Sequence, residues 1–270
     1  MFWRALASSG FHLERFDGDL ATTMTRLNRW DRVDGIILDA VGTVIDPVPS
    51  VARVYAAAAL RQGLTVDLAD VKARFGQYFR NDEVDDQLGP MVTDEATEFR
   101  RWRRIVSNVL PELPDPDQAF AELWDHFGRP DAWRCFPDVG PGLKALRDAG
   151  WPVRIASNFD GRLRDVAGGL ADLGGFTDIL VISSEVGFRK PHPNFYLAAC
   201  TSLGLPPDRV ICVGDDPEND VRGPERAGLR GALLDRDGCC PTGLASFPDL
   251  PALARSLVAS RSEAPRVVVS

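Results

Sequence analysis

Lysine is scarce in this chain, which carries 3 lysines among its 31 basic residues. Aspartate and glutamate together number 39, so the formal net charge is -8 and no surplus of positive charge is available for a nucleic-acid backbone. Long apolar runs are also missing, because no window reaches the roughly 20 uninterrupted apolar residues that a membrane-spanning helix needs. We therefore expect neither a nucleic-acid partner nor a membrane partner.

Cysteine is sparse too, at five residues without the spacing of metal ligands. An odd number of cysteines, two of them adjacent at Cys239 and Cys240, favours reduced thiols over a disulfide framework. Near the start of the chain, the charged residues Glu14, Arg15 and Asp17 come before any apolar stretch long enough for a secretory signal peptide, so we do not expect secretion. These features predict a cytoplasmic protein.

Four short apolar runs share one design, in which a continuous apolar segment ends in small or polar residues. Continuous apolarity is typical of strands buried on both faces, as in a parallel sheet. The predicted strands are 35–40, 152–158, 178–184, 209–216 and a fifth at 231–235. Segments with helical spacing lie between them, at 140–150, 194–204 and 220–228. Strands that alternate with helices predict a doubly wound α/β fold with a parallel, Rossmann-like core sheet.

The stretch from 47 to 137 breaks this alternation with four amphipathic helical patterns, near 51–62, 67–80, 92–109 and 117–128. Ligands of open α/β sheets bind beyond the carboxyl ends of the strands, so a helical insert that leaves from there should cover the site as a cap. We predict a core of 34–46 and 138–255, a helical cap of 47–137, an N-terminal extension of 1–33 and a C-terminal tail of 256–270.

Polar residues stand where the predicted strands end or in the loops that follow. They are Asp39, Ser157, Asn158, Lys190, Asp215 and Asp216. Because the carboxyl ends of parallel strands meet at one edge of a sheet, we expect these side chains to converge. Clustered carboxylates repel one another unless a cation neutralises them, and an all-oxygen cluster favours Mg²⁺ over zinc. A lysine and a hydroxyl suit a phosphoryl group, which a carboxylate can attack in line.

The motifs that carry these residues resemble those of the haloacid dehalogenase superfamily of hydrolases with an inserted C1-type cap. In order along the chain they are "DAVGT" (39–43), "ASN" (156–158), "KPHP" (190–193) and "VGDDPEND" (213–220). The segments "SNFDGRL" and "SSEVGFRKPHPNFY" are also similar to the group of haloacid dehalogenase-like hydrolase domain-containing protein 3. The resemblance covers about residues 34–240 and implies a hydrolase that acts on a small phosphorylated metabolite.

The resemblance also implies a role for each matching residue. Asp39 would be the nucleophile, and Ser157 and Lys190 would hold the transferring phosphoryl group. Substrate contacts would further come from Asn158 and from the backbone near Val41, Gly42 and Thr43. The cofactor Mg²⁺ would be bound by Asp39, the backbone carbonyl of Val41 and Asp215, with Asp216 or Asp220 in support.

Val41 departs from the pattern, because phosphatases of the superfamily usually carry a second aspartate there that protonates the leaving group. Losing a positioned general acid typically costs roughly 10² to 10⁴ in rate. Four alternatives stay open: a slow or substrate-restricted Mg²⁺-dependent phosphatase, a phosphate-compound binder with little turnover, a 2-haloacid dehalogenase, and an enzyme that forms a Schiff base on Lys72. The phosphatase is the working hypothesis. We expect the protein to be a monomer or a homodimer.

Overall fold

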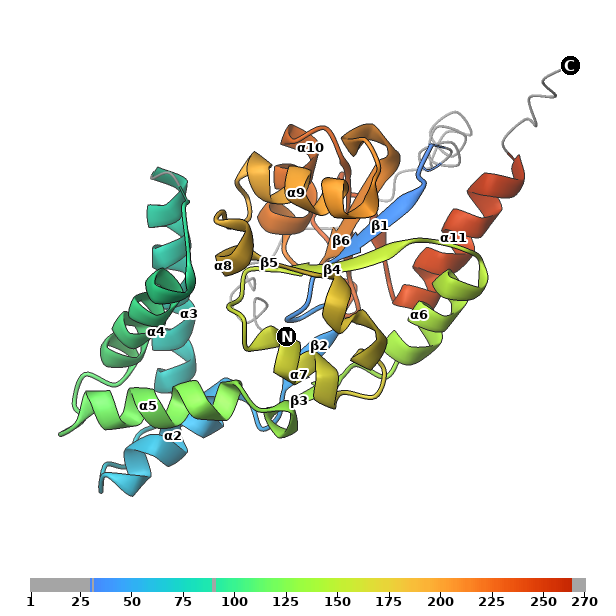
Figure 1. The fold of residues 1–270 in the computed structure, drawn as a ribbon. Coiled ribbons are helices and arrows are strands. Elements are labelled where there is room, and N and C mark those ends of the chain that lie inside the picture. The colour runs from blue at the N-terminus through green and yellow to red at the C-terminus, as the bar shows by residue number, and fades with distance from the viewer. Residues whose placement is uncertain (1–29, 31, 89–90, 264–270) are drawn as a thin grey trace, which may run out of the picture.

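The fold is built on a six-stranded parallel sheet (Figure 1). This computed structural model describes residues 30, 32–88 and 91–263, and its strand order is β5-β4-β1-β6-β7-β8. The strands are β1 (Gly35–Leu38), β4 (Val153–Ser157), β5 (Leu180–Ile182), β6 (Val210–Gly214), β7 (Arg230–Leu234) and β8 (Ser246–Phe247). Because β1 pairs in parallel with β4 on one side and with β6 on the other, the sheet is wound in both directions from its centre. The predicted doubly wound α/β fold is confirmed.

Helices cover both faces of the sheet, which explains why its strands are apolar throughout. The helices of one face are α6 (Val139–Asp148), α7 (Leu163–Gly169) and α11 (Leu250–Glu263), and α9 (Pro193–Leu203) covers the other. Ile36 and Leu38 of β1 pack into the first of these two cores, and Ile37 packs into the second. A strand buried on both faces tolerates polar residues only where it ends, which is where Asp39 stands.

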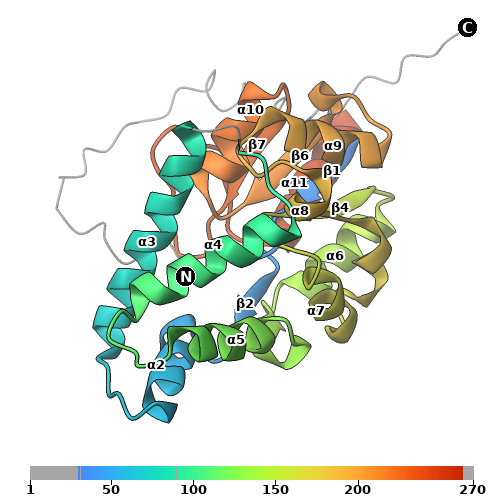
Figure 2. The same ribbon diagram turned by 60° about the vertical axis from the view of Figure 1, so that its left-hand side comes forward.

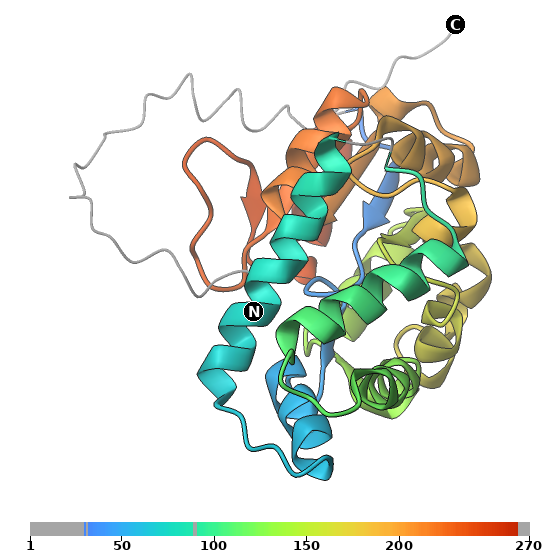
Figure 3. The same cartoon turned by 90° about the vertical axis from the view of Figure 1, so that its left-hand side faces the viewer.

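A helical insert, residues 51–127, stands beside the sheet and has a hydrophobic cluster of its own around Tyr55, Ile105 and Leu123. Its helices are α2 (Val51–Arg61), α3 (Leu68–Leu88), α4 (Glu95–Val109) and α5 (Pro116–Phe127). Two antiparallel strands, β2 (Ile45–Pro47) and β3 (Trp133–Cys135), connect the insert to the core. Viewed from the insert side, α3 and α4 lie in front of β1 (Figure 3).

Short helical segments complete the core. They are α8 (Ser183–Val186), α10 (Gly223–Arg226), the 3₁₀ turns η1 (Pro130–Ala132), η2 (Gly174–Ile179) and η3 (Pro207–Arg209), and the π-helical segment η4 (Pro217–Arg222). The beginning of α4 lies against α8, so the insert contacts the core at a second place besides its two connecting strands (Figure 2). None of the helices in the described residues combines the length and the hydropathy that crossing a lipid bilayer requires.

The two terminal segments differ from their predicted boundaries. Residues 1–29 and 31 of the predicted extension lie outside the described residues, but Trp30 packs in the core against Phe247. The predicted tail of 256–270 begins inside α11, which buries Leu253 and Leu257. Apolar residues spaced three and four apart give α11 a buried face, and this short signal was missed in the sequence.

Candidate active site

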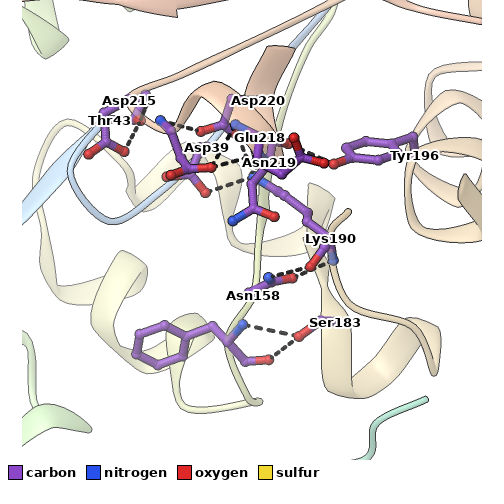
Figure 4. Close-up of polar contacts among 12 residues, drawn as sticks. Asp39, Thr43, Asn158, Ser183, Lys190, Tyr196, Asp215, Glu218, Asn219 and Asp220 are labelled. Carbon is purple, nitrogen blue, oxygen red and sulfur yellow. Dashed lines mark hydrogen bonds and ion pairs between the residues drawn. The ribbon is translucent and has the colours of Figure 1, made fainter. Parts of the chain in front are cut away.

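The predicted strand ends meet at one edge of the sheet (Figure 4). Asp39 follows β1 and Asp215 follows β6. Asp220 belongs to η4, and its carboxylate lies close to those of Asp39 and Asp215. One carboxylate oxygen from each of these three residues lies within 4.8 Å of the other two. The Nζ of Lys190 lies 2.8 Å from Asp39 Oδ1 and 2.8 Å from Asp220 Oδ1. We call Asp39, Asp215, Asp220 and Lys190 the carboxylate cluster.

Two glycines allow this close approach. Gly42 has a φ of +88°, and a Cβ at this position would collide with the carboxylate of Asp215. A Cβ at Gly214, the last residue of β6, would collide with the carboxylate of Asp220. Side chains at either position would therefore push the carboxylates out of the cluster.

Asp216 and Asp220 have different positions, although either could support a metal ion in the sequence-based prediction. The Asp216 carboxylate accepts hydrogen bonds from the backbone N–H groups of Glu218 (2.9 Å) and Asn219 (2.7 Å), so it caps the start of η4. The backbone N–H of Asp216 in turn donates to Asp220 Oδ2 at 3.0 Å. Asp220 is therefore the residue of this segment that joins the carboxylate cluster, and Asp216 holds the turn that brings it there.

Asn158 and Thr43 hold other site residues in place. The Asn158 side chain accepts from the backbone N–H of Lys190 (2.7 Å) and donates to the Lys190 carbonyl (3.0 Å). The Thr43 hydroxyl accepts from the backbone N–H of Asp215 (3.1 Å) and donates to its carboxylate (3.4 Å). Both residues were predicted to contact substrate, and in this structure their side chains are engaged with Lys190 and Asp215.

Burial and mutual repulsion govern ionisation in the carboxylate cluster. Burial raises the pKa of Asp39 to about 6, and the charge of Lys190 opposes this rise. Burial, with the charges of Asp39 and Asp220, raises the pKa of Asp215 well above its usual value. Burial lowers the pKa of Lys190, but Asp220 and Asp39 outweigh this effect, so its net shift is upward and the ammonium stays charged.

The donor set fits Mg²⁺, the cofactor expected from the motifs. Three carboxylates gather oxygen atoms within 4.8 Å, and Lys190 can neutralise only one of their three charges. A divalent cation would offset the other two, and oxygen ligands are those that a hard ion prefers. The residues that would hold it are Asp39, Asp215 and Asp220, with the predicted carbonyl of Val41.

A pocket opens above the carboxylate cluster, between the core and the helical insert. Core residues such as Asp39, Ser157 and Lys190 form its floor, and Val41 lines it beside them. Apolar side chains of the insert form its wall, including Tyr55, Phe75, Phe79, Trp102, Phe120 and Trp124. This wall was not predicted from the sequence, because rings four positions apart on a helix give the same pattern whether they fill a core or line a pocket.

Lys72 lies outside this site. It is exposed on α3 and does not line the pocket. Schiff-base chemistry needs an amine that reaches the substrate in the pocket, and Lys72 does not reach it.

The chain belongs to the haloacid dehalogenase-like hydrolase family, whose model matches residues 33–228. It is 27% identical over 207 residues to haloacid dehalogenase-like hydrolase domain-containing protein 3 of Danio rerio, covering 74% of this chain and 84% of the relative. It is 26% identical over 236 residues to a phosphoserine phosphatase of Thermus thermophilus, covering 80% and 93%. The L-2-haloacid dehalogenase from Xanthobacter autotrophicus has a similar fold, with a TM-score of 0.63, 18% identity, and coverage of 83% and 97%. The predicted family and hydrolase class are confirmed.

Proposed function

We propose that this hydrolase removes the phosphoryl group from a small phosphorylated metabolite through Asp39, with Mg²⁺ as cofactor. The position of Lys190 carries the proposal, because its ammonium lies 2.8 Å from both Asp39 and Asp220 on the floor of the pocket. A phosphoryl group that enters the pocket meets a nucleophile and a fixed positive charge together. The similarity to a phosphoserine phosphatase supports the same reaction type.

The reaction would proceed in two steps on Asp39. A carboxylate oxygen forms a bond to phosphorus while the bond from phosphorus to the leaving oxygen breaks, and that oxygen keeps the electron pair. Water then attacks the phosphorus, and the bond from phosphorus to Asp39 breaks with its electron pair returning to the carboxylate. One proton of the water stays on the inorganic phosphate, and the other passes to solvent. Mg²⁺, when bound, supplies positive charge that offsets the phosphoryl oxygens. Lys190 stabilises the same charge from the protein side.

Val41 restricts the first step. It lines the pocket beside Asp39, and its side chain has no proton to give to the leaving oxygen. A leaving group that is unstable as an anion should therefore depart slowly. Its rate of departure should be lower by a factor of roughly 10² to 10⁴ than in an enzyme with a positioned acid. We infer a phosphatase that is slow or restricted to good leaving groups.

The same valine favours a second candidate, a phosphate-compound binder that has largely lost turnover. A 2-haloacid dehalogenase is less favoured, because the fourth motif of those enzymes holds no metal ion, whereas the acidic residues of this motif bring two carboxylates to a cluster that fits a cation. The cytoplasmic location and the oligomeric state, a monomer or a homodimer, stay predictions. All five cysteines are free thiols in the structure.

The test is phosphate release from acyl, aryl and sugar phosphates, with and without Mg²⁺. Wild type is compared with Asp39→Asn and with the control Asp148→Asn, whose aspartate is exposed on α6. We expect Mg²⁺-dependent release that is lost in Asp39→Asn and kept in the control. Tight binding of inorganic phosphate without release from any substrate would instead identify the binder. Chloride release from 2-chloropropionate alone would identify the dehalogenase.

A further inference from the structure

The pocket above the carboxylate cluster has two chemically different sides. Its charged lining side chains all belong to the core, whereas the ten lining residues of the helical insert are apolar or aromatic. Seven of those ten are aromatic, although aromatic residues make up only 9% of the chain. A sugar or amino-acid substrate would leave hydroxyl, ammonium or carboxylate groups without partners against this wall. The wall therefore favours a substrate whose non-phosphate part is apolar.

Three rings of the wall form a continuous aromatic surface. Phe75 and Phe79 of α3 are stacked with their ring centroids 5.6 Å apart. The Trp102 ring of α4 lies 5.9 Å from Phe79 and 6.4 Å from Phe75. Phe79 and Trp102 are only partly buried and both line the pocket, so another ring can contact them. Aromatic rings at such distances attract one another, and this attraction adds to the free energy gained from burying their apolar surface.

Two polar groups of the core that line the pocket beside this wall are already engaged. The Arg162 guanidinium forms two hydrogen bonds of 2.7 Å to the buried carboxylate of Asp160 and stacks on the ring of Trp124, 3.3 Å from its centroid. The indole N–H of Trp133 donates to the carbonyl of Phe127 at 3.0 Å. With its charge neutralised, Arg162 offers little to a second anionic group on the substrate. The group that contacts the wall should therefore be uncharged.

We propose that the leaving group of the substrate is an uncharged aromatic group joined to phosphate through an acidic oxygen, as in an aryl phosphate or an aromatic acyl phosphate. This inference rests on the proposed phosphatase function. When Asp39 attacks, the bond from phosphorus to that oxygen breaks and the electron pair is delocalised into the ring or the carbonyl group. The leaving group then needs no proton, which fits Val41 at the position beside Asp39.

A matched pair of substrates tests the proposal. Acetyl phosphate and benzoyl phosphate release carboxylates of similar acidity, but only the second carries a ring. We expect kcat/KM to be about tenfold or more higher for benzoyl phosphate in wild type, because its ring buries apolar surface against the wall. Trp102→Ala should lower this ratio about fivefold, mainly through KM. The control Leu60→Ala, on the exposed side of α2, should leave the ratio unchanged.

The alternative outcomes distinguish a failure of the aromatic leaving group from a failure of the phosphatase function. Equal kcat/KM for the two substrates, or a ratio unaffected by Trp102→Ala, would overturn the aromatic leaving group while the phosphatase stands. No phosphate release from either substrate would overturn the phosphatase itself. Should Trp102→Ala fail to fold, Trp102→Leu removes the ring but keeps an apolar side chain, and the same fall in the ratio is expected. Equal binding of phenylphosphonate and methylphosphonate, measured by calorimetry, would contradict the proposal without depending on turnover.

Discussion

Two buried ionic clusters meet at neighbouring residues of one loop, and they differ in what they face. Lys190 extends to Asp39 and Asp220 on the floor of the pocket. The Nε of Arg189, one residue earlier, lies 3.4 Å from Glu98 Oε1 of α4. We call Thr93, Glu98, Arg101 and Arg189 the Glu98 cluster, and each of these four residues is at most 5% exposed.

The Glu98 cluster differs from the carboxylate cluster in its charge balance. The Thr93 hydroxyl donates to Glu98 Oε1 at 2.6 Å, and Arg101 Nη1 lies 3.6 Å from Glu98 Oε2. Its members do not line the pocket, and its single carboxylate has cations on more than one side. The carboxylate cluster has surplus negative charge beside a cavity. Unbalanced charge that faces a cavity, rather than burial alone, therefore distinguishes the candidate active site.

The largest effect should come from removing the cation of the carboxylate cluster. Lys190→Met leaves Asp39 and Asp220 to repel one another and removes the positive charge that would stabilise a phosphoryl group in the proposed reaction. We expect kcat/KM for benzoyl phosphate to fall about 10³-fold or more. Lys144→Met, which removes an exposed lysine paired with Asp148, is the matched control and should keep wild-type activity. Retained activity in Lys190→Met would show that the carboxylate cluster, like the Glu98 cluster, is not required for the reaction.

Breaking the Glu98 cluster should affect stability more than chemistry. Glu98→Gln keeps an acceptor for Thr93 but leaves buried guanidinium groups without their carboxylate, so the free energy of unfolding should fall by about 3 kcal/mol. Urea denaturation measures this change. Glu185→Gln, at the exposed ion pair with Arg164, should change it by less than about 1 kcal/mol. A loss of kcat as large as that of Lys190→Met would show that the Glu98 cluster also belongs to the reaction.

An acid placed beside Asp39 should narrow the difference in rate between good and poor leaving groups. Val41→Asp provides a proton donor for the leaving oxygen, so hydrolysis of an alkyl phosphate should rise about 10²-fold. Acyl phosphates, which depart without a proton, should gain much less. The control Val41→Leu changes size but adds no acid, and it should produce no gain. Phosphate release from the two substrate classes gives the comparison directly.

Metal binding should stabilise only a protein with an intact carboxylate cluster. Mg²⁺ at about 100 times its dissociation constant should raise the melting temperature by about 5 °C, since it binds the folded state and offsets surplus negative charge. Asp215→Asn should remove most of this shift, and Asp148→Asn should keep it. An equal shift in both variants would indicate that Mg²⁺ binds elsewhere.

The fold and the polar floor of the site were largely predictable from the sequence. Continuous apolar runs identify strands buried on both faces, and parallel strands bring their carboxyl ends to one edge, which places Asp39, Ser157 and Asp215 together. Short elements such as β8 and α8 were missed, because two to four residues carry too little periodicity to stand out. The choice between Asp216 and Asp220 was also open, because both are acidic and follow β6.

The sequence by itself determined the doubly wound sheet, the convergence of the motif residues and the valine at position 41, because each follows from local periodicity, topology or residue identity. Only the tertiary structure decided that Asp220 joins the cluster, that Arg189 turns to Glu98 while Lys190 turns to Asp39, and that the rings of the insert face the pocket. The physical reason is that periodicity identifies the apolar face of a helix but not what that face meets. The direction of a buried charge depends on partners that lie far away in the chain.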